Sequence, residues 1–148
     1  MGLRAAVGRG PVALDTAAFI YFIEEHPKYA PLVAGLFSDA DRGVRLIVTS
    51  ALTLLEVLVV PCRAGDIALA ERYEAILSRS RGVRLVELDR AQLRAAAQLR
   101  AAHRIRTPDA LQLAAALTQS CSAFVTNDRA MPAVPDLRIL QLSAFVET

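Results

Sequence analysis

Short apolar runs alternate with longer segments of helical periodicity along this chain of 148 residues. Strands that alternate with helices favour an α/β fold with a mainly parallel sheet. No linker, repeat or low-complexity tract interrupts the pattern, so we expect a single domain over residues 1–148. The pattern predicts strands over 12–15, 45–48, 83–88, 123–126 and 138–142, and helices over 17–25, 32–40, 49–60, 66–78, 89–103 and 107–120.

The stretch 46–62 is the most apolar part of the chain, but it carries Glu56 near its centre and reaches Pro61. We therefore expect a buried strand followed by a helix that Pro61 ends, rather than a membrane span. Cys62 and Cys121 lack metal or redox spacing and are expected to be buried, reduced thiols. Together with the lack of a recognisable signal peptide, this predicts a cytoplasmic protein with no membrane association.

Four acidic residues stand in apolar surroundings. Asp15 follows the run 12–14, Glu56 interrupts the helix expected over 49–60, Asp109 lies in the first turn of a helix, and Asp128 closely follows a strand. A carboxylate in apolar sequence is costly unless it is paired, hydrogen-bonded or bound to a cation. Ligands of open α/β sheets bind at the carboxyl ends of the strands, where Asp15 and Asp128 are predicted to lie.

Convergence of these acids would require a cation, because neighbouring carboxylates repel one another. Oxygen ligands without histidine or cysteine favour Mg²⁺ or Mn²⁺ over zinc. Ordinary explanations also exist for three of the acids taken singly. Asp15 could cap a helix, Asp109 could complement a helix dipole, and Asp128 could belong to a turn. Glu56 instead continues a narrow polar stripe with Ser50 and Thr53 on an apolar helix, which suits a lined pocket.

Four ordered segments of the chain carry a family resemblance. They are Leu14-Asp15-Thr16, then Thr49-Ser50 with Leu55-Glu56-Val57-Leu58, then Thr107-Pro108-Asp109-Ala110-Leu111-Gln112-Leu113-Ala114, and finally Val125-Thr126-Asn127-Asp128. On these segments the chain resembles PIN-domain proteins and, within that family, the VapC toxins of bacterial toxin–antitoxin pairs. Gln112 departs from many relatives, which carry histidine there.

The resemblance implies a three-layer fold with a central parallel sheet of about five strands flanked by helices. It also implies a homodimer, Mg²⁺- or Mn²⁺-dependent endoribonuclease activity, and a cognate VapB-like antitoxin that blocks the site. By the motif match, the four acids correspond to the family's catalytic, metal-binding residues. We expect Asp15 and Asp109 to be direct ligands. Glu56 is expected to bind the metal through water or to orient the nucleophile, and Asp128 to support a ligand or to bind a second ion. Thr126 and Thr16 are expected to support them.

An RNA substrate requires positive charge near the acids, and the net charge of +2 permits nucleic acid as a partner. Arg106 and Arg129 adjoin the acids in sequence and are the predicted phosphate contacts. Two alternatives to a toxin remain open: a housekeeping PIN nuclease in RNA processing, and a catalytically silent PIN-fold binding module. Two explanations are likewise open for the aromatic residues of the early helices, a dimer interface or the core; these are Phe19, Tyr21, Phe22 and Tyr29.

Overall fold

The computed structural model describes residues 2–146, and its centre is one sheet of five parallel strands. The strand order is β3-β2-β1-β4-β5, so β1 lies in the middle between β2 and β4. The predicted α/β class and parallel sheet are confirmed. The strands are β1 (Val12–Leu14), β2 (Ile47–Ser50), β3 (Val83–Val86), β4 (Ala123–Thr126) and β5 (Arg138–Gln141).

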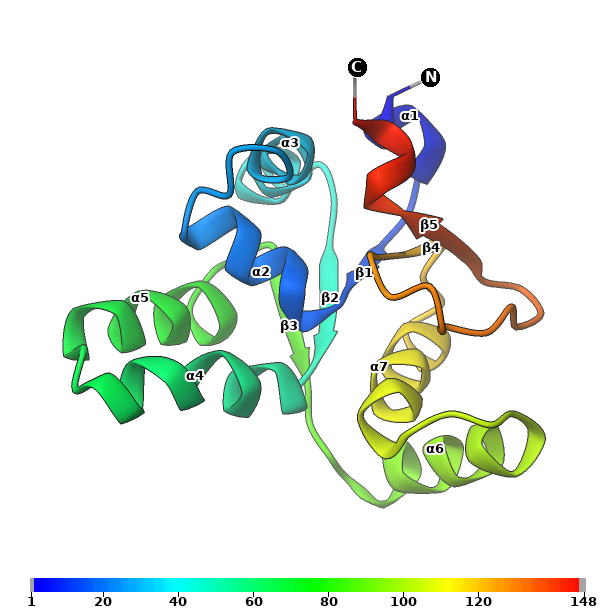
Figure 1. Ribbon diagram of the computed structural model, residues 1–148. Coiled ribbons are helices and arrows are strands. Elements are labelled where there is room, and N and C mark those ends of the chain that lie inside the picture. Colours follow the sequence, from blue (N-terminus) through cyan, green and yellow to red (C-terminus); the bar gives the residue numbers. More distant parts are fainter. Residues whose placement is uncertain (1, 147–148) are drawn as a thin grey trace.

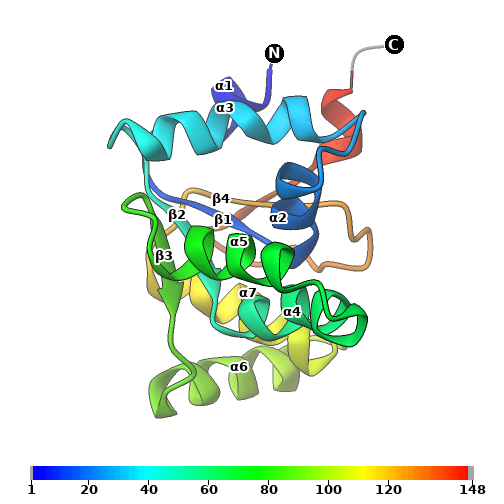
Figure 2. The same cartoon turned by 90° about the vertical axis from the view of Figure 1, so that its left-hand side faces the viewer.

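Helices cover both faces of the sheet and complete three layers (Figures 1 and 2). They are α1 (Leu3–Val7), α2 (Thr16–Ile23), α3 (Ala30–Asp41), α4 (Leu52–Ala64), α5 (Ile67–Ser78), α6 (Arg90–Ala102), α7 (Thr107–Thr118) and the short 3₁₀ helix η1 (Leu142–Phe145). Among residues 2–146, no helix combines the length and the apolar character needed to cross a bilayer.

Successive side chains of β1 point to opposite faces of the sheet, so this strand contributes to the core on both faces. Val12 and Leu14 pack into the cluster built with α2, α3 and α5, whereas Ala13 packs into the cluster under α7. Successive side chains of a strand point to opposite faces, so a strand buried on both sides is apolar throughout. This explains why β1 and β4, which are buried throughout, are apolar runs, whereas the edge strands β3 and β5 carry the exposed Arg84 and Arg138. It also leaves the strand ends as the places where polar groups can gather.

Two details of the α4 region differ from the sequence predictions. Pro61 does not end the helix but lies inside it, and the helix continues to Gly65, which caps it in the left-handed conformation (φ 69°). Proline removes only its own N–H bond, and so close to the end of the helix few further bonds depend on it. Cys62 is exposed rather than buried, whereas Cys121 is buried as expected and burial raises the pKa of its thiol to about 12.

The aromatic residues of the early helices lie in the core or pack against it. Phe19 is fully buried, and Phe22 stacks on Phe37 with ring centroids 4.0 Å apart. Tyr21 and Tyr29 pack against the same cluster. Phe19 is therefore a core residue, whereas Tyr21, Phe22 and Tyr29 are only partly buried, and a dimer interface that includes them stays a prediction.

Helix α1, which the sequence pattern did not predict, is tied to the domain through one buried carboxylate. Asp39 of α3 accepts hydrogen bonds from the guanidinium groups of Arg4, Arg42 at 2.9 Å and Arg45 at 3.4 Å. The hydrogen bond from Arg4, together with the other two arginines, lowers the pKa of Asp39 despite its burial. The cluster joins α1, α3 and the segment before β2.

We expect Asp39→Asn to lower the free energy of unfolding by about 2 kcal/mol at pH 7, since hydrogen bonds to a charged group are lost. An acid whose folded-state pKa is depressed stabilises the fold above its unfolded value of about 3.8. The difference between wild type and variant should therefore shrink as the pH falls from 4 through the lowered pKa. Urea unfolding at several pH values measures this, with the exposed Asp41→Asn as control. Equal stability of wild type and Asp39→Asn at pH 7 would contradict it.

Candidate active site

All four acids predicted from the sequence line one cavity of about 240 Å³ where β1 and β4 end. The chain leaves β1 toward β2 on one side and returns to β4 on the other, so this is the point where the strand order reverses. Open parallel sheets form their binding crevices at such points. The lining residues are Asp15, Thr16, Ala17, Glu56, Arg106, Pro108, Asp109, Gln112, Asp128 and Met131.

Asp15 is held between β1, α2 and β4. One carboxylate oxygen accepts a hydrogen bond from the backbone N–H of Ala18 at 3.2 Å and caps α2, and the other accepts from the Thr126 hydroxyl at 2.5 Å. Burial raises the pKa of Asp15 to about 6; these two hydrogen bonds oppose the shift, and the charges of Asp128 and Glu56 add to it. Asp15 is thus a helix cap and a cavity residue together.

Thr126 connects the acids of β1 and β4. Its side chain is fully buried, and its hydroxyl oxygen accepts a hydrogen bond from the backbone N–H of Asp128 at 2.9 Å while donating to Asp15. The Asp128 carboxylate in turn accepts from the backbone N–H of Ala130 at 2.9 Å, which is ordinary turn chemistry. Asp128 therefore fulfils the turn explanation and also lines the cavity.

Glu56 reaches the cavity from α4. The Thr16 hydroxyl donates to its carboxylate at 2.6 Å, so a side chain of α2 fixes a side chain of α4. Thr53 lies one turn before Glu56 and is fully buried, which agrees with the prediction that the polar stripe of this helix faces inward. Ser50 is also buried, although its hydroxyl accepts from the backbone N–H of Leu52 and serves the local turn.

Asp109 reaches the cavity from the first turn of α7. The guanidinium of Arg106 lies 3.5 Å from its carboxylate, and the Arg106 side chain is 79% exposed. Arg106 lines the cavity, so this predicted phosphate contact lies beside the acids. Arg129 is exposed next to Asp128 and is not among the cavity residues.

The donor set of the cavity fits a hard divalent cation. Its oxygen-bearing side chains are the four carboxylates, the Thr16 hydroxyl and the Gln112 amide, and the pKa of Asp15 is raised mainly by burial, with a further contribution from the charges of Asp128 and Glu56. Within residues 2–146, no three His, Cys, Asp or Glu side chains lie close enough together to hold a metal by themselves.

The hydrogen-bonded residues behind the acids were missed by the sequence reasoning. Thr49 and Gln112 are buried and hydrogen-bond Thr53 at 2.7 Å each. The available signal was their spacing, because Thr49 and Thr53 are four residues apart across a strand–helix junction, and Gln112 follows Asp109 by three.

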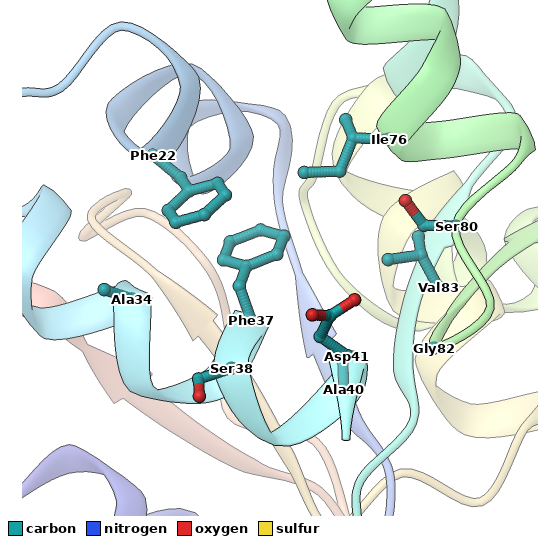
Figure 3. A pocket seen from close by; sticks show the side chains of 10 residues that line it. All are labelled: Phe22, Ala34, Phe37, Ser38, Ala40, Asp41, Ile76, Ser80, Gly82 and Val83. Atoms are coloured by element: carbon teal, nitrogen blue, oxygen red, sulfur yellow. The ribbon is translucent and has the colours of Figure 1, made fainter. Parts of the chain in front are cut away.

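A second, more apolar cavity of about 350 Å³ lies between α3 and α5 near the start of β3 (Figure 3). Phe22, Phe37, Ile76 and Val83 contribute its larger apolar side chains. It lies toward the amino ends of the strands, and none of the four acids lines it. Its chemistry is that of a docking groove rather than of a metal site.

Residues 12–137 match the model of the PIN domain. The chain belongs to the PIN-domain family. This confirms the resemblance drawn from the four ordered segments, which all lie inside the matched region. Members of the family are generally nucleases. No curated protein matches the sequence of this PIN-domain chain.

Several solved structures share the fold of this PIN-domain protein. A chain of VapBC2 from Rickettsia felis, bound to a DNA fragment from its promoter, superposes with a TM-score of 0.67 at 16% identity, covering 88% of this chain and 98% of the other. A toxin–antitoxin complex from Klebsiella pneumoniae gives 0.62 at 18% identity, with 85% and 94% covered. DNA-bound VapBC from Salmonella typhimurium gives 0.61 at 21%, with 90% and 98% covered.

Two substitutions of Asp15 distinguish its role as the cap of α2 from the free-energy cost of burying its charge. Asp15→Ala should lower the free energy of unfolding by about 1 kcal/mol in chelator, because the cap of α2 is lost. Asp15→Asn should lose less stability than Asp15→Ala, since asparagine keeps the cap and removes a charge that burial disfavours, although its NH₂ group cannot accept the hydrogen bond of the Thr126 hydroxyl. Thermal unfolding in chelator at pH 7 measures both. An equal loss in the two variants would mean that the charge itself stabilises the fold.

Proposed function

We propose that this protein is a Mg²⁺- or Mn²⁺-dependent endoribonuclease toxin of the VapC type, acting in the cytoplasm and blocked by a VapB-like antitoxin. The observation that carries the proposal is the convergence of Asp15, Glu56, Asp109 and Asp128 on one cavity at the carboxyl ends of β1 and β4. These residues come from four separated segments, and ordinary capping or turn roles do not explain why they meet.

Asp15 and Asp109 are the direct ligands in this proposal, with Glu56 and Asp128 holding water or a second ion. The bound ion would lower the pKa of a water molecule and offset negative charge on the phosphate. Thr126 holds Asp15 and Asp128 in register through its two hydrogen bonds. Side chains that orient ligands in this way commonly affect metal affinity as strongly as some ligands do.

The reaction is hydrolysis of an RNA phosphodiester. Water attacks phosphorus in line, the bond to the 3′-oxygen breaks, and that oxygen takes up a proton. The products are a 5′-phosphate and a 3′-hydroxyl. The Arg106 guanidinium, exposed at the mouth of the cavity, is placed to bind a phosphate oxygen. Arg129 would contact the strand further along its backbone.

The solved structures favour a toxin over a housekeeping nuclease as the function of this protein. The chains from Rickettsia felis, Klebsiella pneumoniae and Salmonella typhimurium come from toxin–antitoxin structures, and 94–98% of each is covered. A silent binding module is disfavoured because all four acids are retained and meet in one cavity. The same structures support an antitoxin as partner.

The apolar groove between α3 and α5 is the surface we assign to the antitoxin. Three adjoining cavities share Phe22 as a lining residue, so the groove extends from Val83 past Phe22 toward Pro31. Figure 3 shows the rings of Phe22 and Phe37 side by side within it. An amphipathic segment with apolar anchors suits such a groove.

A homodimer is proposed through a different surface. Helix α4 and the start of α5 expose Leu55, Val59, Val60 and Ile67, and the last two are 67% and 71% exposed. Monomeric proteins rarely expose contiguous apolar side chains on this scale. The core does not bury these apolar side chains of α4. Their exposure supports the proposal that a second copy of the chain covers this face.

Cleavage of total RNA by metal-stripped protein tests the proposed function. Discrete cuts should appear with Mg²⁺ or Mn²⁺ and vanish with chelator. Asp15→Asn and Asp109→Asn should reduce the rate by at least about 100-fold, because a lost ligand should cost no less than a lost supporting residue. Asp66→Asn is the matched control, since Asp66 also caps a helix, α5, but lies outside the cavity. Wild-type rates in Asp15→Asn would refute the metal role.

Val60→Glu should convert the dimer to a monomer, since two buried like charges would face each other across the interface. Val44→Glu is the control, because Val44 is equally exposed at 67% but lies in the segment between α3 and β2. Sedimentation velocity measures the mass of both variants and of wild type. A Val60→Glu variant that remains dimeric would place the interface elsewhere.

A further inference from the structure

A buried network of polar side chains lies directly behind the acidic cavity. Its members come from α2, β2, α4 and α7: Thr16, Thr49, Thr53 and Gln112, with Glu56 at its outer end. Thr49, Thr53 and Gln112 are 1%, 0% and 5% exposed. Burying polar groups costs free energy unless each is hydrogen-bonded, and in this network each of them is.

Two groups of fixed polarity set the direction of every bond in the network. The backbone N–H of Ser50 can only donate, and it points at Gln112 Oε1 at 3.3 Å. The Gln112 amide is therefore oriented with its oxygen toward Ser50 and its NH₂ toward Thr53, at 2.7 Å, and Thr16, at 3.5 Å. The second fixed group is the backbone carbonyl of Leu14, which can only accept and lies 2.9 Å from the Thr49 hydroxyl.

Each hydroxyl has a single proton, so the remaining directions follow. The Thr49 hydroxyl donates to the Leu14 carbonyl at 2.9 Å, with Gln112 Oε1 as a more distant second acceptor at 3.4 Å, and Thr53 must then donate across its 2.7 Å contact with Thr49. Gln112 fills an acceptor position on Thr53 and approaches Thr16 as a donor. The proton of Thr16 is left for Glu56 at 2.6 Å, a charge-assisted bond that is shorter than its 3.3 Å contact with Thr53.

We propose that Gln112 is a positioning residue which, through Thr53 and Thr16, aims a hydroxyl proton at Glu56 and fixes that carboxylate on the wall of the cavity. This inference rests on the proposed function, since it concerns how Glu56 serves a bound ion. Helix α7 then has two tasks one turn apart: Asp109 lines the cavity directly, and Gln112 holds an acid that belongs to α4. The asymmetry of the amide is essential, because one end must accept and the other must donate.

Mn²⁺ titration calorimetry on purified protein tests the proposal without RNA. Gln112→Met keeps the size of the side chain and removes both hydrogen-bonding ends. It should weaken Mn²⁺ binding about 10-fold, the scale of a lost orienting residue. In a Glu56→Gln background the same change should cost less than about twofold, because the residue it acts through is already altered. Thr53→Val, which is isosteric, should behave in the same way and serves if Gln112→Met does not fold.

Gln92→Met is the matched control. Gln92 is a glutamine of α6 that is equally buried, at 5% exposure, and donates to the Thr118 hydroxyl at 2.6 Å, away from the cavity. It should leave Mn²⁺ affinity unchanged, whatever it does to the melting temperature. A loss of affinity that is the same with and without Glu56, or none at all, would overturn the role of Gln112 alone. Wild-type protein that binds no Mn²⁺ would overturn the proposed metal site and this inference with it.

Discussion

The hydrogen bond from Thr126 to Asp15 is the contact on which the arrangement of the site depends. It joins the carboxyl ends of β1 and β4, the two strands between which the chain order reverses. The same carboxylate caps α2 through the backbone N–H of Ala18. One side chain therefore fixes where the central strand ends, where the next helix begins and how the neighbouring strand is placed. Asp128 is tied to this junction through Thr126, and Glu56 is tied to it through Thr16, the first residue of the helix that Asp15 caps.

Two carboxylates of this chain, Asp39 and Asp15, differ in how well neighbouring groups balance their negative charge. Asp39 is surrounded by Arg4 and two further arginines, and its pKa is lowered. Asp15 has only a hydroxyl and a backbone N–H, faces other acids, and its pKa is raised. Arginine is abundant in this sequence, but the arginine that lines this cavity, Arg106, pairs with Asp109 and not with Asp15. A binding site for a cation needs this residual negative charge, whereas a structural ion pair does not.

The sheet and the four acids could be predicted because both leave local signals. A strand buried on both faces is a continuous apolar run, and a carboxylate beside such a run stands out. The network around Gln112 left almost none, because it joins residues up to 96 positions apart and its logic depends on which atom faces which. The prediction that Pro61 ends its helix was wrong for a related reason. A proline near the end of a helix removes few hydrogen bonds, and only the packing decides whether the helix continues.

The ion pair between Arg106 and Asp109 is weak, and this makes Arg106 available to another partner. The two charges are 3.5 Å apart and the arginine side chain is largely exposed, so the pair contributes at most about 1 kcal/mol to stability. An incoming phosphate offers the guanidinium a bidentate partner of higher charge. In the proposed nuclease, Arg106 would therefore exchange Asp109 for a substrate phosphate at little cost, and the Asp109 carboxylate released from the pair would then be free to bind a cation. A buried, well-formed pair at the same position would oppose both steps.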